Sequence, residues 1–177
     1  METELADSWG QFLDRYHWDW FCTFTFGHRQ WQYEYHHTGV SALGHPMRTE
    51  STLRLMEVGR PCAVPSFTAH HQFGHFVRDL SLASPVPVAW FRADEIGLRG
   101  RFHLHALVTG TAQLRRLSWM DEWNRRNGYA RILAFDPKKG AAYYCAKYVT
   151  KQFGDWELGS SLGYEYFLGP AFQRRQK

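Results

Sequence analysis

The stretch RFHLHALV, residues 101–108, alternates apolar and polar side chains at almost every position. A period of two is typical of a β-strand, because successive side chains point to opposite faces of the sheet. The apolar face is expected to line the core and consists of Phe102, Leu104, Ala106 and Val108. The opposite face places His103 and His105 side by side, with Arg101 beside them.

Periodicity on either side of this strand predicts an α+β domain, residues 1–177, large enough to bury a hydrophobic core. Helices are predicted over 4–16, 66–84, 111–126 and 138–152, and strands over 18–26, 86–95, 101–110 and 129–136. The helices are expected to pack on one face of a small antiparallel sheet. Thr111 and Pro137 are expected to begin the last two helices.

Two parts of the chain show no clear pattern. Residues 27–66 are rich in Gly, Pro and His and predict an irregular insertion, whose aromatic residues could stack on DNA bases. Residues 153–177 predict a turn-rich tail.

Composition narrows the class of protein. The sequence has no apolar run long enough for a membrane span and no charged start followed by an apolar segment. The three cysteines lack the spacing of a zinc site or a disulfide framework. We therefore expect a cytoplasmic protein that does not contact a membrane.

Positive charge is concentrated in one half of the chain. Residues 99–151 contain eleven Lys or Arg and three Asp or Glu, a local balance of +8 in a chain of net charge +4. The remainder must then sum to −4. This asymmetry is typical of a protein that binds a polyanion, although an unevenly charged surface would give the same pattern.

The histidine pair suggests a metal site. Imidazoles two positions apart on a strand have Cβ atoms roughly 6–7 Å apart and can bind one ion together. Glu95, eight positions before His103, ends the neighbouring predicted strand, and Asp94 is the rival carboxylate. Two His and one carboxylate suit a divalent ion that also binds a phosphate oxygen, whereas a pair of surface histidines is the alternative.

The predicted helix 138–152 carries AAYYCAKYVTK. Tyr144 and Tyr148 are one helical turn apart and share a face with Lys147 and Lys151, whereas Tyr143 points about 100° away and is expected to pack. A phenol near an ammonium group and a phosphate can act as a nucleophile. A basic helix that only touches nucleic acid remains the alternative.

Together these motifs resemble those of the HUH endonuclease superfamily. The patterns are E-x-x-x-R-G-x-x-H-x-H (Glu95 to His105) and Y-x-x-K-Y-x-x-K (Tyr144 to Lys151), and FCTFTF (21–26) is similar to the family's first motif. The likeness is greatest to rolling-circle replication initiators of phages and plasmids, and it covers roughly residues 18–152. The spacing within the first pattern favours Glu95 over Asp94.

The resemblance implies a ferredoxin- or RRM-like sheet and a specific chemistry. His103, His105 and Glu95 would hold Mg²⁺ or Mn²⁺, and Tyr144 would attack single-stranded DNA, leaving a 5′-phosphotyrosyl bond and a free 3′-OH. Lys147 would assist. Tyr148 would be a second nucleophile, as in two-tyrosine initiators, or a packing residue. Expected DNA contacts are Thr23, Thr25, Arg99, Arg101 and Lys151.

The implied partners are single-stranded DNA at an origin, including a hairpin, and the helicase and polymerase of a bacterial host, since no helicase phosphate loop follows. Two other functions remain open. One is a transposase of a single-strand insertion sequence, and the other is a non-enzymatic module that binds single-stranded nucleic acid. A second metal site is less favoured than ordinary surface and helix-face histidines; it would combine His28, His36, His37 and His45 with His70, His71 and His75.

Overall fold

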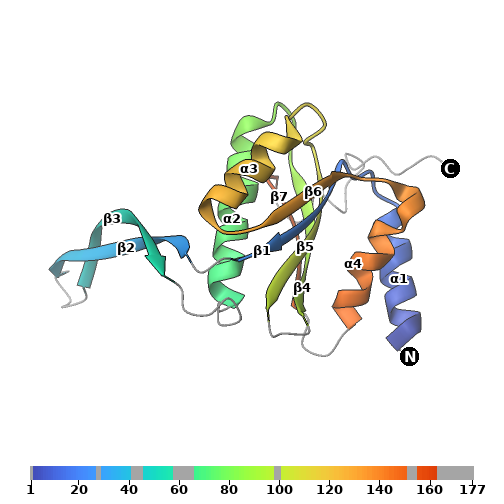
Figure 1. Ribbon diagram of the computed structural model, residues 1–177, viewed down its shortest axis with the longest axis horizontal. Coiled ribbons are helices and arrows are strands. Elements are labelled where there is room, and N and C mark those ends of the chain that lie inside the picture. Colours follow the sequence, from blue (N-terminus) through green and yellow to red (C-terminus); the bar gives the residue numbers. More distant parts are fainter. Residues whose placement is uncertain are drawn as a thin grey trace.

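The computed structural model describes residues 2–26, 29–40, 46–57, 66–97, 101–150 and 155–162. In this part of the chain an antiparallel sheet of five strands has the order β6-β1-β5-β4-β7 (Figure 1). The strands are β6 (Ala130–Ala134), β1 (Trp20–Thr25), β5 (Phe102–Thr109), β4 (Ala89–Ile96) and β7 (Trp156–Ser160). The helices are α1 (Glu2–Asp14), α2 (Ser66–Ala83), α3 (Arg116–Arg126) and α4 (Ala141–Thr150). The predicted α+β class is confirmed.

The central strand β5 is the one that carries the histidine pair. It pairs with β1 and with β4, so that His105 lies opposite Thr23 and His103 lies opposite both Thr25 and Glu95. The predicted alternation holds along β5, since its four apolar residues of one face are all buried.

One face of the sheet is covered by α2 and α3. The core on this face takes its largest side chains from β1, α2 and α3, among them Phe24, Phe73 and Trp123. Residues that the helical period of α2 predicts as its apolar stripe are all buried here, namely Ala69, Phe73, Phe76, Val77 and Leu80.

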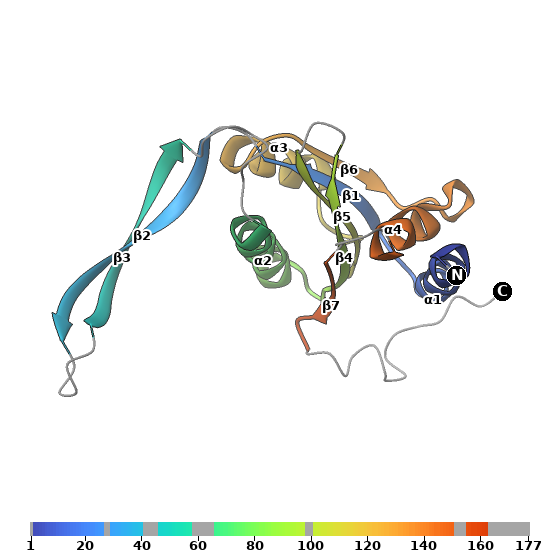
Figure 2. The same ribbon diagram turned by 90° about the horizontal axis from the view of Figure 1, so that it is seen from below.

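The other face is covered by α1 and α4, so the prediction that the helices pack on one face was wrong (Figure 2). The reason lies in β4, where Ala89, Phe91 and Ala93 alternate with the residues of the first core and form a second apolar row. A sheet that is apolar on both faces must be covered on both. Glu95 follows this row at the end of β4, which places it on the α1 and α4 face.

The sequence predicted an irregular segment over residues 27–66, but part of this segment forms two strands. Strands β2 (Arg29–Val40) and β3 (Pro46–Glu57) pair antiparallel as a long two-stranded ribbon. The ribbon lies apart from the main sheet, on the far side of α2 (Figures 1 and 2). The alternation of QWQYEY, residues 30–35, was the period-two signal for it, and the surrounding Gly and His residues obscured that signal.

The predicted tail also contains a strand, because β7 pairs with β4 at the edge of the sheet. Two helix starts differ from prediction as well. Thr111 does not cap α3, because that helix begins at Arg116 and Arg115 is its N-cap. The backbone N–H of Thr111 instead donates to Asp19 Oδ2 at 2.7 Å. Pro137 begins a 3-10 turn (Pro137–Lys139), and α4 follows Gly140, whose φ of 64° is left-handed.

The described helices include none with both the length and the apolar character needed to cross a membrane.

Candidate active site

His105 lies beneath α4 with its side chain only 3% exposed. Its Nδ1 is 3.2 Å from Thr23 Oγ1 on β1, and its Nε2 is 2.9 Å from Glu95 Oε2 on β4. The ring is also stacked parallel to that of Phe21, with 6.4 Å between the ring centroids. Three side chains from two neighbouring strands therefore set the orientation of this imidazole.

Tyr144 of α4 contacts both His105 and Phe21. Its ring is nearly perpendicular to the ring of His105, with centroids 5.2 Å apart. It is also nearly perpendicular to the ring of Phe21, with centroids 5.7 Å apart. The tyrosine is nonetheless 43% exposed. A phenol that is held against a buried imidazole and still reaches solvent is accessible to a large substrate.

His103 lies nearer the end of the sheet and is partly buried. Burial lowers the pKa of this imidazole, Glu95 acts in the opposite direction, and Arg101 lowers it further. The neutral form is therefore favoured, and neutral imidazole is the form that binds a metal. The ring packs closely on Gly97, where an added Cβ would lie 3.0 Å from His103 Nε2.

The donor chemistry of Glu95, His103 and His105 fits a divalent cation. They are two imidazoles and a carboxylate on one face of adjacent strands, and the pKa of one imidazole is lowered. Glu95 already contacts His105 and is the direct cross-strand neighbour of His103. The atoms that would bind the ion do not all lie within 4.8 Å of one another, so the three side chains would have to move closer together to bind one ion.

The rival carboxylate Asp94 points to the opposite face. It is buried and bonded to Arg92 Nη1 at 2.5 Å and to His70 Nε2 at 2.7 Å. In the described part of the chain, the group whose metal-binding atoms do lie within 4.8 Å of one another is His70, Asp94 and Asp155. The Arg92 guanidinium lies between these acids and supplies the positive charge there, so we interpret the group as an ion-pair cluster that joins α2, β4 and the start of β7.

The less favoured second metal site would join His70, His71 and His75 to histidines of residues 27–66, whose side chains lie outside the described residues. His70 faces Asp94, whereas His71 and His75 contact each other edge to face, with ring centroids 4.4 Å apart.

The structure brings some of the remaining predicted residues to this face. Lys147 is exposed on α4, one turn beyond Tyr144. Thr25 Oγ1 donates to the carbonyl of Tyr129, and Arg101 is exposed beside β5. The side chain of Tyr148, although within α4, lies outside the described residues, as do Arg99 and Lys151.

Sequence reasoning missed the contact between Thr23 and His105. It could not be found from the residues alone, because it depends on the register of β1 against β5. It also missed Phe21, which the FCTFTF motif contained but which periodicity could not place against a ring on another strand.

Comparisons with protein-family models, curated proteins and solved structures found no match to this chain. The functional interpretation of the site therefore rests on its chemistry and on the resemblance of its motifs.

Proposed function

We propose that this protein is a site-specific endonuclease and ligase of single-stranded DNA that initiates rolling-circle replication through a covalent bond to Tyr144. The observation that carries the proposal is the contact between Tyr144 and His105, which lie 39 positions apart and on different elements. The contact brings a phenol next to a buried imidazole that also contacts a carboxylate, which is what a metal-assisted attack by tyrosine would need.

In the proposed reaction the phenolic oxygen of Tyr144 attacks the phosphorus of the scissile phosphodiester. The bond from phosphorus to the 3′-oxygen breaks as the bond to Tyr144 forms. The proton lost from the phenol is balanced by the proton that the departing 3′-oxygen gains. The products are a 5′-phosphotyrosyl bond and a free 3′-OH, and attack by that hydroxyl reverses the reaction and rejoins the strand.

Each residue of the site has a role that its position supports. His103, His105 and Glu95 would hold Mg²⁺ or Mn²⁺, which when bound polarises the phosphate and offsets its charge. Thr23 and Phe21 keep the His105 ring in place. Lys147, on the same side of α4 as Tyr144, adds positive charge near the phosphate.

The test is the formation of a covalent protein–DNA adduct. We expect purified protein with Mn²⁺ to become attached to members of a random single-stranded DNA library, and sequencing the attached DNA identifies the cleavage site. Tyr144→Phe should lose the adduct completely. Tyr143→Phe is the matched control, because Tyr143 is its neighbour on α4 and is equally exposed, at 43%.

Two results would contradict the proposal: no adduct with any DNA in Mn²⁺ or Mg²⁺, or an adduct that persists in Tyr144→Phe. Metal-independent DNA binding that survives loss of both histidines would favour a non-enzymatic binding module instead. A peptide map of the adduct also decides whether Tyr148 is ever the attached residue.

A further inference from the structure

Arg131 on β6 is an exposed cation in the same row of the sheet as the candidate active site. It is the direct cross-strand partner of Thr23, and Thr23 is in turn the partner of His105. Directly opposite residues of antiparallel strands share a face. Arg131, Thr23 and His105 thus form one row across β6, β1 and β5.

The neighbours of Arg131 along β6 fix the direction of its side chain. Ala130 and Ile132 are buried in the core beneath α2 and α3. Strand alternation therefore turns Arg131 toward the face that carries His105. Within the described part of the chain, Arg131 forms no ion pair with a carboxylate. An exposed guanidinium in this state is available to a phosphate group.

Tyr129, directly before β6, has the largest exposed fraction of any aromatic side chain in the described residues, 63%. Its carbonyl accepts hydrogen bonds from the backbone N–H and from Oγ1 of Thr25, which is the cross-strand partner of His103. These bonds fix the backbone of Tyr129 at the end of the sheet where His103 lies. An exposed ring at a fixed backbone position is a surface on which a base can stack.

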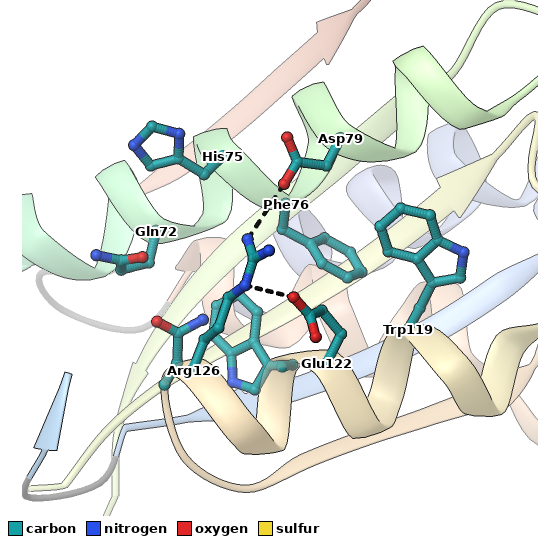
Figure 3. Close-up of a pocket in the computed structure, with 9 residues that line it drawn as sticks. Gln72, His75, Phe76, Asp79, Trp119, Glu122 and Arg126 are labelled. Carbon is teal, nitrogen blue, oxygen red and sulfur yellow. Dashed lines mark hydrogen bonds and ion pairs between the residues drawn. The ribbon is translucent and has the colours of Figure 1, made fainter. Parts of the chain in front are cut away.

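The opposite face of the sheet is closed to a polymer. There Arg126 of α3 bridges to Asp79 of α2 at 3.3 Å (Figure 3). The hollow that remains between these helices has room for about one water-sized group. A nucleic-acid strand that reaches the candidate site therefore lies on the α1 and α4 face, which Arg131 shares.

The spacing of the strands separates Arg131 from the candidate metal ligands. Neighbouring strands lie about 4.8 Å apart, so two strand spacings put the Cα atoms of Arg131 and His105 roughly 10 Å apart. At this separation a DNA strand that binds at His105 places a neighbouring phosphate, not the scissile one, at Arg131.

We infer that Arg131 and Tyr129 hold single-stranded DNA beside the scissile bond. Arg131 binds a backbone phosphate that flanks the scissile one, and Tyr129 stacks on an unpaired base. Both residues lie outside the motifs that resemble those of the HUH endonucleases. The inference rests on the proposed function for its choice of single-stranded DNA as the ligand.

The test measures non-covalent binding in EDTA, so that cleavage plays no part. A fluorescein-labelled oligothymidylate of about 20 nucleotides, longer than one binding site, is titrated with the protein at several KCl concentrations. Anisotropy gives the Kd and its salt dependence. Arg131→Gln should weaken binding and reduce the slope of log K against log salt by about 0.7, the loss of one phosphate contact on a single strand.

Arg115→Gln is the matched control for this variant. It removes the same charge from an exposed position at the start of α3, on the opposite face, and should leave the slope unchanged. Arg131→Lys keeps the charge at the proposed position and should keep the slope.

Tyr129→Ala should weaken binding at least about 5-fold, the lower end of the loss of one stacked base. The salt slope should not change, because the ring carries no charge. Tyr129→Phe keeps the ring and should bind as the wild type does.

A wild-type slope in Arg131→Gln, or a wild-type Kd in Tyr129→Ala, would overturn the inference. Photocrosslinking of the wild-type protein to DNA that contains iododeoxyuridine covers the case in which a variant does not fold. Crosslinks at other aromatic residues and none at Tyr129 would then count against the stacking role. The expected binding effects without any covalent adduct in Mn²⁺ would uphold the inference and contradict the proposed function alone.

Discussion

Both ring nitrogens of His105 contact a side chain of an adjacent strand, Thr23 at Nδ1 and Glu95 at Nε2. A hydroxyl can donate or accept, so Thr23 satisfies Nδ1 in either tautomer of the neutral ring. If Nε2 held a metal ion, as proposed, Nδ1 would carry the proton and donate a hydrogen bond to the threonine oxygen. Mutation of a group that orients a metal-binding histidine in this way typically lowers metal affinity or activity 10- to 100-fold.

Thr23→Val removes the hydroxyl and keeps the shape of the side chain. We expect Mn²⁺ affinity to fall by roughly 10-fold, measured as free Mn²⁺ by electron paramagnetic resonance, with adduct formation partly restored at high Mn²⁺. Thr25→Val is the control on the same strand, because that hydroxyl donates to the carbonyl of Tyr129 instead. Equal loss of affinity in the two variants would exclude a specific role for Thr23.

The two described cysteines should be inert. Cys22 and Cys145 are fully buried, and burial raises the pKa of both thiols well above the ordinary value. Because the thiolate is the reactive form, we expect iodoacetamide at pH 8 to leave both unmodified in the native protein and to alkylate both in guanidinium. Peptide mass spectrometry gives the extent at each position, and rapid labelling of either in the folded state would contradict the buried placement.

At the scale of elements, α4 is held against α1 by a close contact. A Cβ added at Gly10 would overlap the ring of Tyr143. This contact agrees with the packing role that helical spacing predicts for Tyr143. It also means that the helix carrying Tyr144 is positioned by α1 as well as by the sheet.

Gly10→Ala is therefore expected to destabilise the protein by about 1–3 kcal/mol through overpacking, more than the gain of up to about 1 kcal/mol in helix propensity. Gly74→Ala in α2 is the matched control. Nothing lies within 4 Å of a Cβ added at Gly74, so this change should stabilise by about 0.5–1 kcal/mol. Urea unfolding measures both, and similar free energies of unfolding for the two variants would argue against close packing at Gly10.

The elements of the main sheet were predictable to different degrees. Strand β5 and helix α2 follow from the spacing of their apolar residues, because these residues form one continuous buried row in each element. Strand β7 has a weak pattern of its own. It is held by pairing with β4 and by the ion pair between Arg92 and Glu157, and these contacts join residues 65 positions apart, beyond the reach of local periodicity.

The arrangement of the candidate site was also only partly predictable from the sequence. Strand alternation places His103 and His105 on one face, and the direct pairing of Glu95 with His103 agrees with the expected choice of carboxylate. Spacing alone could not place Tyr144 against His105, because this contact depends on how α4 packs across the sheet. The metal-binding role of the three residues remains a prediction.

For the whole molecule, the interface between α2 and α3 should make stability depend on pH. Burial lowers the pKa of His75, and the neighbouring His71, Arg78 and Arg126 lower it further, whereas Asp79 raises it. The unfolded chain, with a His pKa of about 6.5, then binds more protons than the folded protein just below that pH. The contribution of His75 is thus fully present above about pH 6.5 and is lost as the pH falls below it.

His75→Gln should remove this part of the pH dependence. We expect the difference in free energy of unfolding between wild type and variant to change between pH 7.5 and pH 5.5, with the wild type losing more stability on acidification. Urea unfolding at a series of pH values measures it, and a constant difference would mean that His75 titrates alike in the folded and unfolded states.

Helix α4 joins β6 to β7, the two outer strands of the five-stranded sheet. These strands run in the same direction, because each of the four pairings between them is antiparallel. The helix therefore connects one margin of the sheet to the other, and Tyr144, the proposed nucleophile, lies next to His105 of the middle strand β5. In the proposed reaction, a DNA end bound to Tyr144 would therefore lie over His105, where a 3′-hydroxyl could attack it again.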